Sequence, residues 1–199
     1  MDIKSPNPKA FILINCLTMS RIPLSVLAYM ELSTGTNRIA HYLLLFLAIV
    51  ATDFFDGKAA RAFHVQSNFG AAADVFCDFF YIITSSYALY RQELFPLWML
   101  ALITIKLVEF IITSRTATAG KQHHHIFIFD YIGRYTAISF YVLPVAILIF
   151  NRLLSISVFN RVLCALYTTL LFSSMISSVY RIGILSMRKL IAPKSRSYS

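Results

Sequence analysis

Four aspartates with helical spacing stand close together between two apolar stretches of the chain. They are Asp53, Asp56, Asp74 and Asp78, which fall within 26 residues and make up nearly half of the nine acidic residues. Asp53 and Asp56 are spaced i, i+3, and Asp74 and Asp78 are spaced i, i+4, so each pair shares one face of a helix. Acidic side chains in or beside a membrane span are costly to bury and mark candidate functional sites. Their concentration here indicates bound divalent cations.

The elements that carry these aspartates are apolar segments of membrane length. The chain has 199 residues, of which 58% are hydrophobic, and its mean hydropathy is +0.68. Soluble domains are about half apolar, whereas apolar stretches of about twenty residues recur along this chain. The alternating ten-residue segments of a membrane β-barrel are absent. The sequence therefore predicts an all-α integral membrane protein, a bundle of six transmembrane helices.

Segments rich in Gly, Asn, Ser and Pro separate the six predicted spans. The spans cover residues 11–33, 39–61, 69–90, 96–114, 135–150 and 159–182. A basic tail over 183–199 is expected to fray. The first span contains Asn15, Arg21 and Pro23 and lacks a small-residue cleavage site, so we interpret it as a retained span and not a signal peptide. Residues 1–199 are expected to form a single membrane domain.

The basic residues predict the orientation of the protein in the membrane. With the N-terminus in the cytoplasm, most of the 18 basic residues lie on cytoplasmic segments, which is the bias of the positive-inside rule. Both termini are then cytoplasmic, and the aspartate segment lies at the cytoplasmic end of the second and third spans. The net charge of +9 is interpreted as orientation and anionic-lipid contact, not as nucleic-acid binding.

Because the second span runs inward and the third runs outward, the four carboxylates are expected to converge. Asp53 and Asp78 form the deeper pair, and Asp56 and Asp74 the shallower one. Small residues on both spans let the helices approach closely. These are Gly57, Ala60, Gly70 and Ala71 to Ala73. An alternative in which cationic side chains pair with the acids is rejected at this stage, because too few cations are predicted within the spans.

Oxygen-only ligands favour Mg²⁺ or Mn²⁺ over zinc. Two such ions about 3.5–4 Å apart suit phosphoryl or diphosphate chemistry, because they contact both the attacking and the leaving oxygen. Arg61, just beyond the aspartates, offers a fork of N–H donors for a phosphate oxygen.

The spacing D-x2-D-G-x2-A-R-x8-G-x3-D-x3-D resembles the signature of the CDP-alcohol phosphotransferase, or CDP-alcohol phosphatidyltransferase, family (class I). The matching residues are Asp53, Asp56, Gly57, Ala60, Arg61, Gly70, Asp74 and Asp78. The segment Asn15-Cys-Leu-Thr18-Met-Ser-Arg21 resembles the N-x-L-T-x-x-R at the start of the family's first span. Gly133-Arg134-Tyr-Thr136 resembles, less closely, the G-[KR]-x-[TS] before its fifth span.

The resemblance implies an enzyme that transfers substituted phosphate groups in phospholipid synthesis. A hydroxyl of an acceptor alcohol attacks the β-phosphorus of a CDP-linked lipid, usually CDP-diacylglycerol, and CMP leaves. The implied metal ligands are Asp53, Asp56, Asp74 and Asp78, with Asp78 also acting as general base. The residues implied for the CDP-lipid are Thr18, Arg21, Gly57, Arg61, Ser67 and Gly70. A homodimer in the bacterial cell membrane is also expected from the resemblance.

The acceptor alcohol stays open at this stage. Glycerol 3-phosphate is the default because that branch is common in the family, and inositol phosphate, serine and phosphatidylglycerol are the alternatives. Arg134 is the candidate for binding an acceptor phosphate, although ordinary positive-inside charge explains it equally well. Two other classes are an intramembrane prenyltransferase, whose motifs lack D-G-x2-A-R, and a divalent-cation transporter, whose acids would be spread across the bilayer.

Two weaker polar signals lie outside the aspartate segment. Lys106 and Glu109, spaced i, i+3 within the fourth span, are expected to pair with each other, and the alternative is that they line the acceptor pocket. His123 to His125 are expected to lie in a solvated loop, because consecutive side chains point in different directions and rarely share one metal ion.

Overall fold

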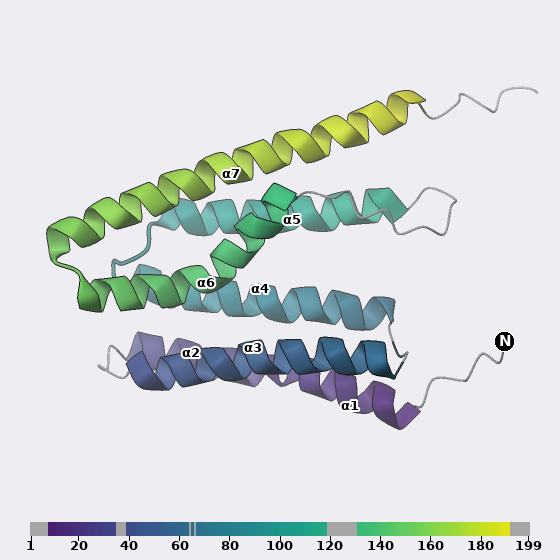
Figure 1. The fold of residues 1–199 in the computed structure, drawn as a ribbon, viewed down its shortest axis with the longest axis horizontal. Helices are drawn as coiled ribbons and strands as arrows, with labels where there is room; N and C mark the ends of the chain where they lie inside the picture. The colour runs from purple at the N-terminus through teal and green to yellow at the C-terminus, as the bar shows by residue number, and fades with distance from the viewer. Residues whose placement is uncertain (1–7, 35–38, 64, 66, 119–130, 192–199) are drawn as a thin grey trace, which may run out of the picture. The chain divides into compact units, whose positions relative to one another are not determined.

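The computed structural model describes residues 8–34, 39–63, 65, 67–118 and 131–191. Within these residues the regular secondary structure is all α-helix, and turns join the helices (Figure 1). The helices are α1 (Pro8–Met19), α2 (Arg21–Ser33), α3 (Ile39–Ala62), α4 (Asn68–Arg91), α5 (Leu97–Thr118), α6 (Tyr131–Leu153) and α7 (Ile156–Ile191). The predicted all-α class is therefore confirmed.

The first predicted span consists of two helices, α1 and α2, which meet at Ser20. Pro23 has no N–H to donate to the carbonyl of Met19, so the helical hydrogen-bond pattern is interrupted there. The break is only local, because the Ser20 N–H still donates to the Cys16 carbonyl at 3.0 Å. The consequence is that Arg21 begins a new helix.

The C-terminal helix is longer than the sequence suggested. The tail from residue 183 was expected to fray, but α7 continues to Ile191. Between Gly183 and Ile191 the sequence contains no helix-breaking residue, and the first proline of this tail is Pro193. An isolated glycine lowers helix stability without ending the helix, so the expectation of fraying was wrong over residues 183–191.

Four segments of the described chain are long and apolar enough to cross a membrane. They are Phe11–Ser33, Ile39–Ala62, Ile132–Leu153 and Ile156–Gly183. Helices α4 and α5 overlap the third and fourth predicted spans, but α4 carries Asp74 and Asp78, and α5 carries Lys106 and Glu109. Membrane insertion is thus supported by four segments, and the count of six spans stays a prediction.

The helices group into two compact units. The first contains residues 1–100 and 141–155, and the second contains residues 101–140 and 156–199. The division inside α6 lies just before Pro144, which cannot donate to the carbonyl of Phe140. In the first unit α2 packs against α3 and α4, and α1 also contacts both. The core of this unit includes fully buried Ala28, Ile49, Cys77 and Leu89.

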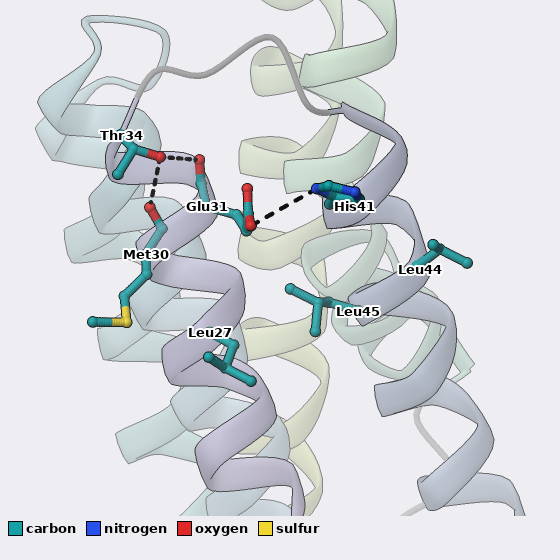
Figure 2. A pocket seen from close by; sticks show the side chains of 7 residues that line it. All are labelled: Leu27, Met30, Glu31, Thr34, His41, Leu44 and Leu45. Carbon is teal, nitrogen blue, oxygen red and sulfur yellow. Dashed lines mark hydrogen bonds and ion pairs between the residues drawn. The ribbon is translucent and has the colours of Figure 1, made fainter.

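An open groove of about 650 Å³ lies between the end of α2 and the start of α3 (Figure 2). It is lined by Leu27, Met30, Glu31, Thr34, His41, Leu44 and Leu45. Its polar rim includes His41 Nδ1, which lies 4.0 Å from Glu31 Oε1. Because α3 runs back along α2, the groove is at the opposite end of this helix pair from Arg21 and the aspartates.

Candidate metal and substrate site

A short turn between α3 and α4 brings the two aspartate pairs together. Hydrogen bonds close the end of α3, including one of 3.1 Å from the Val65 N–H to the Ala60 carbonyl. Ser67 then caps α4, since its hydroxyl accepts the Gly70 N–H at 2.9 Å. This N-cap satisfies one of the free N–H groups at the helix start. The turn reverses the chain, so α4 runs antiparallel to α3 (Figure 1). The expected close approach of these two helices was wrong, because α1 and α2 pack against both of them and bring the aspartates together.

Gly70 allows the close approach of α1 to this cap. A Cβ atom at residue 70 would lie 3.2 Å from Ser67 Oγ and 3.5 Å from Asn15 Oδ1. The first distance is tighter than ordinary contact, so a larger residue would disturb the cap. Ser67 and Gly70, expected to contact the CDP-lipid, therefore have a structural role as well. Asn15 of the N-terminal motif lies beside them.

The four carboxylates converge on one guanidinium, that of Arg21, whose side chain is completely buried. Its Nη1 donates to Asp53 Oδ1 at 3.0 Å and to Asp78 Oδ1 at 2.6 Å. Its Nη2 donates to Asp56 Oδ2 at 2.8 Å and also to Asp74 Oδ1. Nη1 therefore binds the pair predicted to lie deeper, Asp53 and Asp78, and Nη2 binds the other predicted pair, Asp56 and Asp74.

These contacts correct one step of the sequence reasoning. Pairing of the acids with cations was rejected because too few intramembrane cations were expected, yet Arg21 pairs with all four aspartates. One planar guanidinium has enough N–H donors for several carboxylates, so a single cation within the spans is sufficient to contact all four. A single positive charge still leaves four carboxylates mostly unbalanced. The cluster therefore retains the negative charge that attracts divalent cations.

The four aspartates differ in how far they face solvent. The Asp56 side chain is 5% exposed, whereas those of Asp53, Asp74 and Asp78 are 44%, 43% and 33% exposed. Asp56 is buried in part by Thr18, whose hydroxyl donates to Asp56 Oδ2 at 2.8 Å. Thr18 itself is 4% exposed. One carboxylate is thus fixed by the protein, and three remain accessible to a ligand.

Three of the carboxylates are close enough to share a metal ion. Asp53, Asp56 and Asp74 each offer one oxygen, and these oxygens lie within 4.8 Å of one another. Carboxylate oxygens are the donors that hard divalent cations prefer, so the residues present fit such an ion. Asp78 is connected to this group through Arg21.

Gly57 and Arg61, spaced i, i+4, share a face of α3 that begins one residue after Asp56. A Cβ atom at residue 57 would meet Arg61 Nη1 at 3.8 Å, an ordinary contact distance. Packing therefore does not require glycine at residue 57. Arg61 is exposed in the last turn of α3, where its guanidinium is accessible to an anionic ligand.

The second unit contains the candidate acceptor residue and a partly buried ion pair. Arg134 is exposed near the start of α6. Lys106 Nζ donates to Glu109 Oε2 at 3.0 Å, which confirms the predicted pair. The sequence did not reveal the third partner, Ser178 of α7, whose hydroxyl donates to the same Glu109 oxygen at 2.6 Å. The histidines at 123–125 lie outside the described residues.

Sequence reasoning placed Arg21 near the CDP-lipid but missed its position at the centre of the aspartates. A signal was available, because Arg21 is the only charged residue between residues 11 and 30. An isolated charge in an apolar span implies a buried partner.

The fold and the site define an integral membrane protein with a carboxylate cluster suited to a divalent cation. The sequence model of the CDP-alcohol phosphatidyltransferase family matches residues 11–188. The chain therefore belongs to this family. Comparison with curated proteins gave no match, and comparison with solved structures gave none either.

Family membership establishes the class of reaction. The protein is a transferase of phosphate-containing groups that acts in phospholipid biosynthesis. It takes the transferred group from a CDP-alcohol and passes it to an alcohol acceptor in the membrane, and the family depends on divalent metal. The two other classes considered, a prenyltransferase and a cation transporter, are therefore set aside.

Proposed function

We propose that this enzyme transfers the phosphatidyl group of CDP-diacylglycerol to glycerol 3-phosphate and releases CMP. The observation that carries the proposal is the convergence of the four signature aspartates on Arg21, with three carboxylates close enough to hold a cation. Inositol phosphate, serine and phosphatidylglycerol are the alternative acceptors.

We infer that Asp53, Asp56 and Asp74, with Asp78, hold two divalent ions, Mg²⁺ or Mn²⁺. When bound, such ions neutralise the charge on the diphosphate oxygens and lower the barrier to displacement. Asp56, fixed by Thr18 and Arg21, is suited to a constant ligand position. The more exposed Asp53 and Asp74 are suited to contact an ion that also meets the substrate.

Asp78 is the proposed general base. Its carboxylate is 33% exposed and is held by Arg21 Nη1 at 2.6 Å, so it is both accessible and oriented. In the proposed step it accepts the proton of the acceptor hydroxyl while the acceptor oxygen bonds to the β-phosphorus. The bond between that phosphorus and the oxygen bridging to CMP breaks, and CMP leaves with the electron pair.

The CDP moiety is proposed to bind beside Asp56 and the turn between α3 and α4. Arg61 is exposed there and offers N–H donors to phosphate oxygens. A Cβ atom at residue 57 would meet Arg61 Nη1 at 3.8 Å, so the absence of a side chain there leaves room beside this guanidinium. Ser67 and Gly70 complete the proposed surface, and the buried Thr18 and Arg21 are proposed to act on the CDP moiety by holding Asp56 beneath it.

Arg134 is proposed to bind the phosphate of the acceptor, because it is an exposed guanidinium in a segment that resembles a family motif.

We also propose one membrane domain over residues 1–199, a homodimer and a bacterial cell-membrane location, all from family resemblance. The basic bias supports cytoplasmic termini. Cysteine labelling at Ser5→Cys and Ser197→Cys tests this orientation, and labelling from outside the cell would reverse it.

The decisive experiment measures CMP release from CDP-diacylglycerol in the presence of each acceptor in turn. We expect release that depends on glycerol 3-phosphate, on added Mg²⁺ or Mn²⁺, and on Asp53 and Asp74. Glu31→Gln is the matched control, because Glu31 is an acid on α2 that lines the groove away from the site. Preference for another acceptor would replace glycerol 3-phosphate, and metal-independent release would contradict the two-metal proposal.

A further inference from the structure

An aromatic cluster adjoins the aspartates within the first unit. Tyr81 of α4 follows Asp78 by three residues, and Phe46 of α3 precedes Asp53 by seven, so each shares a helix face with an aspartate. Tyr141 of α6 contacts both aromatic residues. Its ring centroid lies 4.9 Å from that of Tyr81 and 5.9 Å from that of Phe46. These contacts hold the Tyr141 ring about one helical turn from Asp78 along α4 and about two turns from Asp53 along α3.

The hydroxyl of Tyr141 differs from those of the neighbouring tyrosines. Tyr42 and Tyr81 are fully buried, and their hydroxyls are 2.9 Å apart in a mutual hydrogen bond. The Tyr141 hydroxyl is also buried, but it has no hydrogen-bond partner among the residues that the structure describes. A buried donor without a partner lowers stability, and in natural proteins it calls for an explanation. A ligand oxygen is one such explanation.

The helix positions around this hydroxyl indicate where such a ligand would lie. Asp78 lies one turn before Tyr81 on α4, and Asp53 lies two turns after Phe46 on α3, so each carboxylate shares a helix face with a ring on which Tyr141 packs. A neutral phenol donates one hydrogen bond, whereas an ionised carboxylate only accepts. An alcohol placed between Tyr141 and Asp78 would satisfy both groups, because its oxygen accepts from the phenol while its proton faces the carboxylate.

We propose that the Tyr141 hydroxyl donates a hydrogen bond to the reacting oxygen of the acceptor alcohol beside Asp78. This inference rests on the proposed function, in which Asp78 takes the proton of that alcohol. It adds an acceptor-binding residue on α6 that lies outside the signature segment. The donor lipid is a less suitable partner, since its diphosphate belongs with the cations and arginines of the site.

Tyr141→Phe tests the inference because it removes the hydroxyl and keeps the ring that packs on Tyr81 and Phe46. We expect the KM for the acceptor to rise roughly 2- to 13-fold, the range of one neutral hydrogen bond, with the KM for CDP-diacylglycerol unchanged. The melting temperature should stay the same or rise, because the variant no longer buries an unpaired donor.

Tyr42→Phe is the matched control. It removes a hydroxyl from the same cluster whose hydrogen bond, to the Tyr81 hydroxyl, is present in the structure. We expect it to lower the melting temperature and to leave both KM values unchanged. Comparison of the two variants therefore distinguishes a hydroxyl that binds the acceptor, which changes KM, from one that stabilises the fold, which changes the melting temperature.

The outcomes distinguish this inference from the proposed function. If the wild-type enzyme releases no CMP in response to any acceptor, the proposed function fails and the inference fails with it. If the wild-type enzyme is active, an unchanged acceptor KM in Tyr141→Phe overturns the inference alone. A lower kcat with both KM values unchanged would mean that the Tyr141 hydroxyl bonds to Asp78 and not to the acceptor. Equal changes in both KM values would mean that the hydroxyl supports the fold of the site. Either result also overturns the inference.

Discussion

Arg21 Nη2 lies 2.8 Å from Oδ2 of Asp56, the most buried of the four aspartates. The contact joins the first turn of α2 to the last third of α3, and the same carboxylate oxygen accepts the hydroxyl of Thr18 at 2.8 Å. The N-terminal motif and the aspartate motif are therefore one structural unit. Changes in either motif are expected to affect both metal binding and stability.

Removal of the metal should abolish activity. Chelation with EDTA is expected to stop CMP release, and Mg²⁺ or Mn²⁺ should restore it, because the carboxylate cluster needs divalent charge to bind a diphosphate. Asp53→Asn or Asp74→Asn should abolish turnover and weaken Mn²⁺ binding measured by calorimetry. Glu31→Gln should retain both properties. Full activity in EDTA would show that the cluster does not act through metal.

Arg21→Met should destabilise the metal-free protein. The substitution keeps an apolar stem but leaves the four carboxylates without their shared cation. Loss of one partner from a buried ion pair costs about 3–5 kcal/mol, and we expect the lower end, because three of the four carboxylates are partly exposed.

Thermal unfolding with and without Mg²⁺ measures this effect. Mg²⁺ should raise the melting temperature of Arg21→Met more than that of the wild-type protein, since the ion replaces part of the lost positive charge. Arg91→Met, at an exposed residue that ends α4, is the control and should change little. Equal melting temperatures for Arg21→Met and the wild type would show that Arg21 does not stabilise the cluster.

Asp78→Asn should separate catalysis from binding. The amide keeps the size of the side chain and one oxygen ligand but does not accept the proton of the acceptor hydroxyl. We expect turnover to fall by about 10²-fold or more, the usual scale for a lost general base. CDP-diacylglycerol binding, measured by equilibrium dialysis in detergent, should stay within roughly tenfold of wild type. Normal turnover in this variant would mean that another group is the base.

Arg134→Ala should weaken binding of a phosphorylated acceptor. Loss of a charge-assisted contact of about 1.5–3 kcal/mol corresponds to roughly a 10- to 150-fold rise in acceptor KM. The KM for CDP-diacylglycerol should be nearly unchanged, and Arg134→Lys should recover only part of the loss, because an ammonium lacks the planar fork. Arg152→Ala, an exposed arginine at the other end of α6, is the control. Equal losses for both substrates would assign Arg134 to the nucleotide or to the fold.

The sequence by itself determined the features that depend on residues close together in the chain, namely the helical faces and the apolar helices. The spacing of Asp53, Asp56, Asp74 and Asp78 predicted two helical faces, because residues three or four apart lie on the same side of a helix. Composition predicted apolar helices, and the order of small and acidic residues indicated the family. The end of α7 was less predictable, since basic and serine-rich segments form helices or fray according to packing.

Only the tertiary structure showed what the aspartates contact. Arg21 precedes Asp53 by 32 residues and Asp78 by 57, and no local period relates residues so far apart. The central position of its guanidinium follows from the packing of α2 against α3 and α4. The Tyr141 hydroxyl has no hydrogen-bond partner among the described residues, and this too is a property of packing, because burial and hydrogen-bond partners depend on which helices meet. Local spacing therefore predicted which residues share a helix face, whereas the partners of each buried polar group were decided by contacts between helices.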